Sequence, residues 1–291
     1  MERVNSVCMI VNIDKKNAVS CAEKLADFLH LHHVRVTCES KYRGIFFSDE
    51  ISDDAQSLFE HCDLVVAVGG DGTILNSAKR AAVYEKTVLG VNAGTLGFLA
   101  TVEQHETAQL LRVINGDYQI EERMMLEVSV AGGDPYYAIN EAVVSKGALS
   151  RMIEVKVTCR DTQVNRFRAD GIIVATPTGS TAYSLSAGGP VTDPSLKCIL
   201  LTPICPHSLL SRTVIFSAEK TLKVHVDAKN CDHVAYLTID GQEVVPIASG
   251  QELTVRRAER CVRLATFENK PFYEVLNDKI LAKDRMGKHE I

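Results

Sequence analysis

The sequence predicts two domains of different class, an α/β N-terminal domain with a parallel sheet covered by helices on both faces, followed by a β-rich domain of sandwich type. Up to about residue 117, short apolar runs alternate with stretches whose apolar residues recur every three to four positions, which is typical of strands alternating with helices. From Tyr118 the apolar residues recur at every second position. That period is typical of antiparallel strands with one buried face.

The first domain, residues 1–117, is expected to contain four strands and four helices. Asp14 is the expected N-cap of the first helix, and Asn115-Gly116 ends the last one. The expected strands lie at 7–13, 33–38, 64–68 and 87–91, and the helices lie after Asp14 and at 49–60, 73–83 and 107–114.

The second domain, residues 118–270, is expected to consist mainly of strands. Residues 271–291 turn polar and are compatible with a helix that packs back on the first domain. The expected strands include 126–130, 138–144, 153–157, 167–175, 222–226, 235–239 and 253–255.

Composition excludes several classes of protein. The net charge of −5 provides no general positive field to recruit nucleic acid. No run of about 18 apolar residues is present, and the N-terminal residues lack the layout of a signal peptide. The nine cysteines are scattered without a C-x-x-C pair, which is typical of reduced thiols. We therefore expect a cytoplasmic protein that binds neither nucleic acid nor membranes.

The most informative turn of the first half is Gly69-Gly-Asp-Gly-Thr73, which follows the buried strand 64–68. Ligands of parallel sheets bind at the carboxyl ends of the strands, and glycines there let backbone N–H groups approach a phosphate. A carboxylate would repel phosphate, so Asp71 needs another role. We expect it to take a proton from, or to orient, an attacking hydroxyl.

Two polar segments interrupt the apolar pattern of the second half. Asn140 and Glu141 stand side by side inside an apolar run. They either mark a strand end that reaches water or supply an amide and a carboxylate for sugar hydroxyls. Residues 176–190 are dense in hydroxyls and glycines, with Ser180 as the expected N-cap of a short helix ended by Gly188-Gly189. Unpaired N–H donors at that helix would suit a nucleotide. The pair Asp240-Gly241 is a hairpin-turn signal.

Together these segments resemble the NAD kinases of bacteria, over nearly the whole chain. The Gly69–Thr73 run alone is shared with lipid kinases and phosphofructokinases, whereas Asn140-Glu141 combined with residues 176–190 is more specific. The resemblance implies an active site between an α/β domain and a β-sandwich, and a homodimer or homotetramer. It implies NAD and ATP as substrates, with phosphorylation of the 2′-hydroxyl of the adenosine ribose to give NADP.

The same resemblance assigns roles to residues. It makes Asp71 the catalytic base, Gly72 its neighbour at the diphosphate, and Asn140 with Glu141 the pair that holds the adenosine portion of NAD. Tyr183 is expected to stack on the ligand or to reach across subunits. The remaining expected substrate contacts are Arg151, Arg168, Asp170, Thr181, Ala182, Ser184, Leu185, Ser186 and Gln242.

The expected mechanism is in-line transfer of the γ-phosphoryl group while Asp71 accepts the hydroxyl proton. Mg²⁺ or another divalent cation would arrive with ATP and bridge its phosphates, and no protein residue is assigned as a metal ligand. No Walker A run is present, so the glycine turns are expected to cradle the phosphates. A lipid kinase and a non-catalytic nucleotide sensor are the alternatives. The identity of the phosphoryl donor, the choice between NAD and NADH, and regulation stay open.

Overall fold

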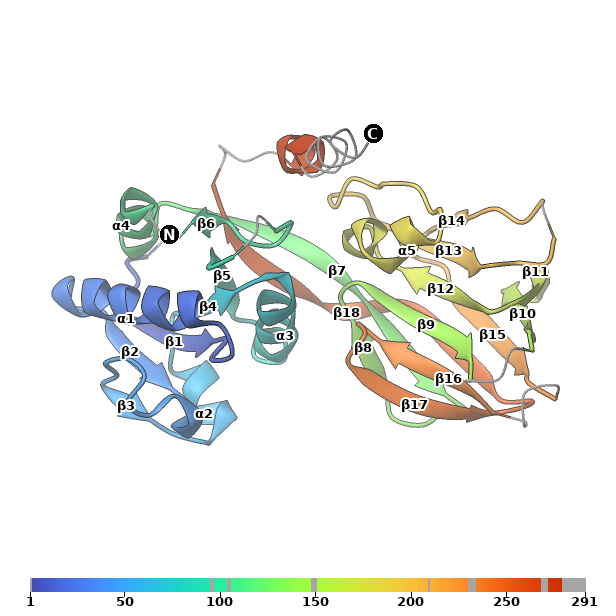
Figure 1. Ribbon diagram of the computed structural model, residues 1–291, viewed down its shortest axis with the longest axis horizontal. Helices are drawn as coiled ribbons and strands as arrows, with labels where there is room; N and C mark the ends of the chain where they lie inside the picture. The colour runs from blue at the N-terminus through green and yellow to red at the C-terminus, as the bar shows by residue number, and fades with distance from the viewer. Residues whose placement is uncertain are drawn as a thin grey trace, which may run out of the picture. The chain divides into compact units, whose positions relative to one another are not determined.

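The computed structural model describes residues 2–94, 97–103, 106–147, 151–208, 210–229, 234–267 and 272–278. The chain divides into two compact units, residues 1–122 with 262–291, and residues 123–261. The division falls inside two long strands, β7 (Gln119–Val130) and β18 (Glu252–Thr266), which run through both units (Figure 1). The sequence places the division near Asp117 because the change of period begins there.

The first unit is built around a parallel sheet with the order β5-β4-β1-β2-β3. The end of β18 pairs in parallel with β5 through Arg263 and Leu264. The strands are β1 (Ser6–Val11), β2 (Arg35–Cys38), β3 (Glu50–Ile51), β4 (Leu64–Gly69), β5 (Thr87–Asn92) and β6 (Val102–Glu103). The helices are α1 (Lys16–Leu31), α2 (Ala55–Glu60), α3 (Asp71–Ala82) and α4 (Thr107–Ile114), with a 3₁₀ turn η1 (Ser40–Tyr42).

The strand order sets the position of the site in this unit. From β1 the chain moves one way to β2 and β3, then returns to place β4 on the other side of β1 and continues to β5. Since crossovers between parallel strands are right-handed, this reversal places α1 and α3 on opposite faces of the sheet. The carboxyl ends of β1 and β4 are therefore a topological switch point, where ligands of open α/β sheets bind.

Two local predictions for this unit were wrong. Asp14 does not cap α1, because the N-cap is Lys15 and no side chain bonds the first turn. Residues 50–51 form the edge strand β3, so only the end of the expected 49–60 helix exists, as α2. The predicted helix 107–114 is confirmed, and Gly116 ends it with φ of +73°.

The second unit is an antiparallel sandwich. One layer has the order β11-β10-β15-β18, continued by β7, which pairs with β18, and by β8, which pairs with β7. The other layer has the order β14-β13-β12-β9-β16-β17. The further strands of this unit are β8 (Tyr136–Ala138), β9 (Glu141–Lys146), β10 (Ile153–Cys159), β11 (Thr162–Ala169), β12 (Gly171–Ala175), β13 (Cys198–Ile204), β14 (Val214–Ser217), β15 (Leu222–Asp227), β16 (Val234–Ile239) and β17 (Glu243–Ala248). Two short turns, η2 (Thr178–Thr181) and α5 (Tyr183–Ser186), follow β12.

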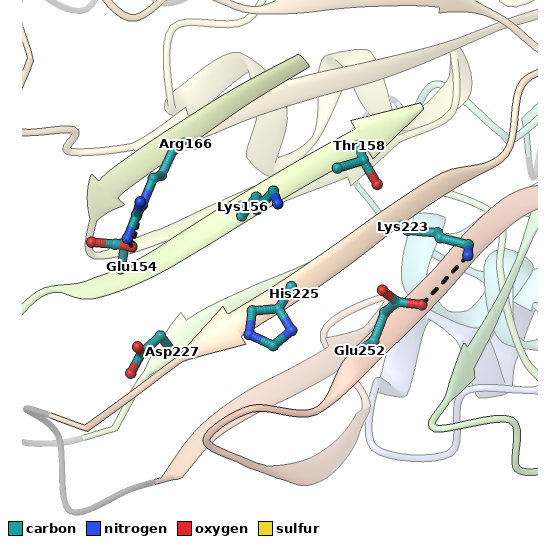
Figure 2. A pocket seen from close by; sticks show the side chains of 8 residues that line it. All are labelled: Glu154, Lys156, Thr158, Arg166, Lys223, His225, Asp227 and Glu252. Carbon is teal, nitrogen blue, oxygen red and sulfur yellow. Dashed lines mark hydrogen bonds and ion pairs between the residues drawn. The ribbon is translucent and has the colours of Figure 1, made fainter. Parts of the chain in front are cut away.

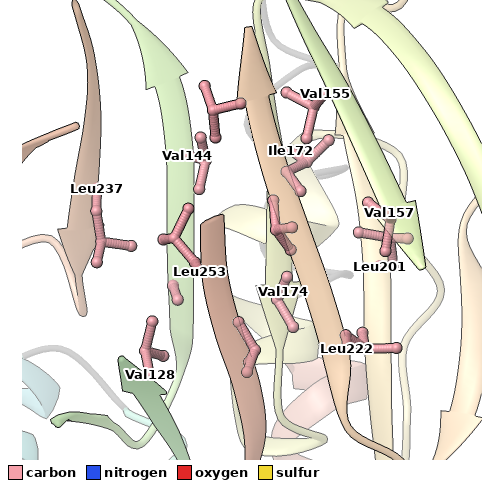
Figure 3. Close-up of a cluster of buried hydrophobic side chains, with 14 of the residues drawn as sticks. Val128, Val144, Val155, Val157, Ile172, Val174, Leu201, Leu222, Leu237 and Leu253 are labelled. Atoms are coloured by element: carbon pink, nitrogen blue, oxygen red, sulfur yellow. The ribbon is translucent and has the colours of Figure 1, made fainter. Parts of the chain in front are cut away.

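The period-two pattern of the second half is explained by the core between these layers. Val155 and Val157 of β10 face Ile172 and Val174 of β12, and Leu222, Leu237 and Leu253 fill the space beside them (Figure 3). Polar residues alternate with them on the outer face of β10 and β15. Strand β12 is buried at every position because residues 173 and 175 face a second small cluster that Ala187 helps to cover. The predicted fold class is confirmed.

The C-terminal segment lies largely outside the described residues. Residues 272–278 are helical, and the ring centroids of Phe272 and Phe98 lie 5.9 Å apart within the first unit. Within the described part of the chain, no helix has the length and apolar character needed to cross a membrane.

Candidate active site

Asp71 lies at the switch point of the first unit, as the first residue of α3. Its carboxylate is held from a distant segment, because Oδ2 accepts a hydrogen bond from the backbone N–H of Phe98 (2.9 Å) and Oδ1 from that of Leu99 (3.2 Å). A carboxylate oxygen can accept more than one hydrogen bond. Asp71 is half-buried, so a hydroxyl can reach it.

Glycines make this arrangement possible. A Cβ atom added to Gly97 would lie 1.9 Å from Asp71 Oδ1, so only glycine lets the backbone pass the carboxylate at this distance. A Cβ atom on Gly69 would lie 2.6 Å from Thr73 Oγ1. The motif glycine therefore serves close packing of strand to helix, while Gly72 has open space around its Cα.

A lysine stands at the same switch point, which sequence reasoning missed. Lys15 precedes α1, and its Nζ lies 3.7 Å from where a Cβ on Gly70 would be. The N-termini of α1 and α3 both face this edge, and helix N-termini favour anions. The arrangement combines one carboxylate with a cation and backbone N–H groups.

In the second unit, three segments that are far apart in sequence meet around Asn140 and Glu141. Asn140 lies between β8 and β9, and Glu141 is the first residue of β9. Asp240, in the turn between β16 and β17, accepts hydrogen bonds from the backbone N–H groups of Ile139 (2.9 Å), Asn140 (2.8 Å) and Glu141 (3.1 Å). The predicted hairpin turn at Asp240 is confirmed, but its side chain has a second role that the turn signal does not reveal.

The hydroxyl-rich segment packs on the same connection. Thr176 donates from Oγ1 to the carbonyl of Ile139 (2.6 Å) and from its N–H to the carbonyl of Asn140 (2.9 Å). A Cβ on Gly179 would lie 2.1 Å from the carbonyl oxygen of Asn140. Residues 139–141, 176–179 and 240 therefore form one hydrogen-bonded unit.

Glu141 is a buried carboxyl with one open oxygen. It is 6 % exposed, and Oε2 has no hydrogen-bond partner among the described residues. Burial and the neighbouring charge of Asp240 raise the pKa of Glu141 to about 7, while a hydrogen bond from the backbone N–H of Tyr183 acts in the opposite direction. A buried oxygen without a partner is costly unless a ligand completes it.

The segment from Thr181 to Ser186 divides into structural and exposed residues. Ser184 is fully buried and shares a hydrogen bond with Thr202 (3.0 Å). Tyr183 is 45 % exposed and Leu185 38 % exposed, Ser186 is exposed, and Thr181 and Ala182 are half-buried.

The prediction that Ser180 caps the short helix was wrong. Ser180 lies inside η2, the N-cap of α5 is Ala182, and the Ser180 hydroxyl binds both backbone groups of Thr192. Its hydroxyl therefore fixes the loop and is not a donor for a ligand. The predicted end of the helix is confirmed, because Gly188 follows α5 with φ of +86°.

The remaining predicted contacts fall in two places. Gln242 is exposed next to the Asp240 turn, where its N–H closes the turn onto the carbonyl of Ile239 (3.0 Å). Arg151, Arg168 and Asp170 belong to the other end of the sandwich. Glu141 pairs with Ala175 at the start of β9, whereas Ser145 near its end pairs with Gly171. Asp170 directly precedes Gly171 and so stands five residues before Ala175, which is about 17 Å along the strand.

At that far end, Asp170 forms an ion pair with Lys146 (2.8 Å), a partner that the sequence did not reveal. Arg168 is exposed on β11, and Arg151 is exposed just before β10. The second unit therefore brings together Asn140, Glu141, residues 181–186 and Gln242, and does not bring them to Arg151, Arg168 and Asp170.

A separate open hollow of about 360 Å³ lies on the outer face of β10 and β15 (Figure 2). Its charges largely pair with one another, since Arg166 binds Glu154 and Lys223 lies 3.9 Å from Glu252. None of the predicted site residues lines this hollow, and we assign it no role. No group of three or more His, Cys, Asp or Glu side chains suited to a metal ion occurs among the described residues.

Comparison with known proteins adds an independent result. Two family models match the chain, the ATP-NAD kinase N-terminal domain over residues 7–118 and the ATP-NAD kinase C-terminal domain over residues 139–267. The NAD kinase of Symbiobacterium thermophilum is 39 % identical over 277 residues, which cover 94 % of this chain and 97 % of the relative. The NAD kinase of Heliobacterium modesticaldum is 39 % identical over 281 residues, covering 94 % and 98 %.

Two solved structures are similar. An NAD kinase from Archaeoglobus fulgidus in complex with ATP has a TM-score of 0.73 at 26 % identity, covering 94 % of this chain and 97 % of the other. Yeast NADH kinase complexed with NADH has a TM-score of 0.84 at 24 % identity, covering 95 % and 87 %, and this likeness is one of fold.

Proposed function

The chain belongs to the NAD kinase family, and from this premise we propose how its own residues carry out the reaction. The enzyme is an NAD kinase, which transfers the γ-phosphoryl group of ATP to the 2′-hydroxyl of the adenosine ribose of NAD and yields NADP and ADP. The assignment of individual residues to steps of that reaction is our proposal, and one observation carries it. Asp71 is held at the switch point by two backbone N–H groups of residues 98 and 99.

Asp71 acts as the general base. The bonds from Phe98 and Leu99 fix the plane of the carboxylate, so that its remaining lone pairs point in a constant direction. When the 2′-hydroxyl attacks the γ-phosphorus, its proton passes to Asp71, and the bond between the γ-phosphorus and the β–γ bridging oxygen breaks to release ADP. Gly72 lies beside the diphosphate, where the absence of a side chain leaves space.

Phosphoryl transfer depends mainly on positioning and on neutralisation of charge. Lys15 supports this role, because its ammonium lies beside Gly70 and can offset the repulsion between Asp71 and the phosphates. A divalent cation, Mg²⁺ in our proposal, would arrive with ATP and supply further neutralisation of the charge on its phosphates.

NAD is held by the second unit in our proposal. Glu141 Oε2 accepts a hydrogen bond from a ribose hydroxyl, because this buried oxygen has no hydrogen-bond partner among the described residues. The Asn140 amide beside it supplies both a donor and an acceptor. The exposed Tyr183 ring offers a face for stacking, and Gln242 lies next to the same turn. The proposal requires one NAD molecule to reach both this pair and Asp71.

We also propose a homodimer or homotetramer in the cytoplasm. Asp170 stands about 17 Å along the strand from the residue opposite Glu141, so a ribose at Glu141 cannot also touch it in the same copy. Arg151 and Arg168 belong to the same end of the sandwich as Asp170. A second copy could supply them.

The test of this function is the variant Asp71→Asn, assayed with NAD, MgATP and detection of NADP. Asparagine keeps the size of the side chain but cannot accept the proton. Because a positioned general base contributes about 10²–10⁴-fold, kcat should fall by that amount. The dissociation constant for NAD, measured by calorimetry, should change by less than about threefold.

A panel of donors in the same assay decides between ATP, other nucleoside triphosphates and polyphosphate, and NADH in place of NAD decides the acceptor. Turnover of Asp71→Asn near the rate of the unmodified enzyme would overturn the assignment of the base.

A further inference from the structure

The turn between β16 and β17 contains an aspartate that the turn does not need. Asp240 and Gly241 have φ values of +50° and +68°, the geometry of a type I′ hairpin turn. Either asparagine or aspartate followed by glycine is a strong sequence signal for that turn. The turn alone therefore does not distinguish a carboxylate from an amide at position 240, and the contacts of the side chain do.

The carboxylate of Asp240 accepts three successive backbone N–H groups. Oδ2 binds Ile139 (2.9 Å), and Oδ1 binds both Asn140 (2.8 Å) and Glu141 (3.1 Å). The backbone N–H of Asp240 returns a bond to the carbonyl of Glu141 (3.0 Å). An asparagine has a single acceptor oxygen, and its NH₂ group would face an N–H donor, so it could not hold all three.

These bonds determine where two side chains point. Asn140 lies between β8 and β9, and Glu141 is the first residue of β9, opposite Ala175 of β12. From the opposite side, Thr176 donates from Oγ1 to the carbonyl of Ile139 and from its N–H to the carbonyl of Asn140, and Gly179 packs closely on the latter. The backbone of residues 139–141 is therefore hydrogen-bonded on both sides, by the Asp240 carboxylate on one side and by Thr176 on the other.

We propose that Asp240 is a positioning residue of the NAD site, which fixes the Asn140 amide and the Glu141 carboxylate in their binding directions and controls the charge of Glu141. This inference rests on the proposed binding role of that pair. Asp240 itself, with its carboxylate oxygens turned to three backbone donors, does not contact NAD.

The electrostatic part follows from the surroundings of Glu141. The charged groups placed on this region are Asp240 from the β16–β17 turn and Arg123 of β7, whose guanidinium lies 3.4 Å from Thr178 Oγ1. From α5, the backbone N–H of Tyr183 stabilises the ionised form, and the phenol of Tyr183 is exposed. Burial and Asp240 raise the pKa of Glu141 to about 7. Removal of the Asp240 charge should therefore lower the pKa of Glu141.

The test uses the full-length protein and the variant Asp240→Asn, which keeps the turn. The dissociation constant for NAD is measured by calorimetry from pH 5.5 to 8.5, alongside KM and kcat. In the unmodified protein, binding should tighten as pH rises through about 7, because an ionised Glu141 can accept from both hydroxyls of a diol. In Asp240→Asn, binding at pH 8 should weaken about tenfold with kcat within about threefold, and the midpoint should move to lower pH.

Asp161→Asn is the matched control. Asp161 also sits in a two-residue hairpin turn, between Cys159–Thr162 partners of β10 and β11, and is exposed. Its substitution should change neither the affinity nor the midpoint. A purely structural role for Asp240 would lower Tm and the active fraction while leaving KM and the midpoint unmoved, and that result would overturn the proposal.

A second variant covers the case in which Asp240→Asn does not fold. Glu141→Gln leaves the turn intact and should abolish the change in NAD affinity near pH 7. Persistence of that change would contradict the control of Glu141. Because calorimetry does not require turnover, it reports on Asp240 even if the enzyme makes no NADP, an outcome that would instead refute the proposed reaction.

Discussion

Two carboxyl groups of this chain stand in opposite environments. Asp71 is half-buried, and each of its oxygens accepts a backbone N–H. Glu141 is buried beside a second carboxylate, with one backbone donor and one oxygen unpartnered within the described residues. The environment of Glu141 lowers the free energy of unfolding, since a buried charge without a partner is costly. Its presence is therefore best explained by a ligand.

The cost of that arrangement can be measured as a dependence of stability on pH. The pKa of Glu141 is raised to about 7 in the native state from its ordinary value of 4.5, by burial and by the charge of Asp240. Between these values the unfolded chain ionises Glu141 and the native chain does not, so the native state binds more protons and the free energy of unfolding falls as pH rises. Above about pH 7 the full penalty is present.

Glu141→Gln should therefore stabilise the protein by about 1–3 kcal/mol at pH 8, with a smaller gain at pH 4.5. Urea unfolding at both pH values checks this, with the exposed Glu23→Gln as the control. A variant less stable than the unmodified protein at pH 8 would show that Glu141 makes stabilising contacts of its own.

At this scale the sequence predicts which side chains carry the chemistry, but not which groups hold those side chains in place. Asp71 was identifiable because a carboxylate in a glycine-rich turn conflicts with phosphate binding. Phe98 and Leu99 were not, because they act through backbone N–H groups, which every residue except proline has. Asp240 stands about 100 residues from the groups that it holds, so no local pattern could connect them.

At the scale of elements, the described residues that follow β5 position Asp71 through the backbone N–H groups of Phe98 and Leu99. Asn92 donates from Nδ2 to the carboxylate of Glu103 (3.0 Å), and Gly94 donates to Asn92 Oδ1 (3.0 Å). These bonds hold the start of the connection, and Gly97 passes close to Asp71 further along it. If Asp71 is the base that we propose, this connection controls its position through the backbone.

A pair of glycine variants isolates that control. In Gly97→Ala the new methyl group would overlap Asp71 Oδ1, so the carboxylate must move although it is still present. A displacement of about 1 Å at a catalytic group costs on the order of 10²-fold, and kcat for NADP formation should fall by that factor. Gly94→Ala is the matched control, because nothing lies within 4 Å of its Cβ position. Equal rates for the two variants would show that residues 98 and 99 do not position Asp71.

The period of apolar residues was sufficient to predict most helices and strands, but not the residues that cap the helices. The helix at 107–114 and the strands of the sandwich were predicted because burial on one face imposes the period. Asp14 and Ser180 were wrong as helix caps because each side chain was judged by type alone. The hydroxyl of Ser180 binds Thr192, 12 residues later, and so is not available to the helix.

At the scale of the whole molecule, β18 shows why topology could not be predicted from the sequence. Its first residues pair antiparallel with β15, and Arg263 and Leu264 pair in parallel with β5. Nothing in the residues of one continuous strand marks where its partner changes. The fold class was predictable because it depends on local periods, whereas this shared strand depends on contacts between distant parts of the chain.

The separation of Asp170 from Glu141 gives a prediction about assembly. If Asp170 contacts NAD, it does so either from a second copy or along one extended NAD molecule in the same copy. The first case makes each active site a composite of two chains. Each site would then take Asp71 from one chain and Asp170 from the other. In a mixed dimer of Asp71→Asn with Asp170→Ala, one site would carry both substitutions and the other site would carry neither.

The two variants should therefore be co-expressed with different tags, and the doubly tagged oligomer purified and assayed for NADP. Each variant alone should lose most activity, whereas the mixed dimer should recover about half of the unmodified rate per dimer, because one of its two sites is intact. Activity no higher than the mean of the two variants would place Asp170 and Asp71 in the same chain's site. Full activity of Asp170→Ala alone would show that Asp170 does not contact the substrate, and that its role is the ion pair with Lys146 at the end of β9.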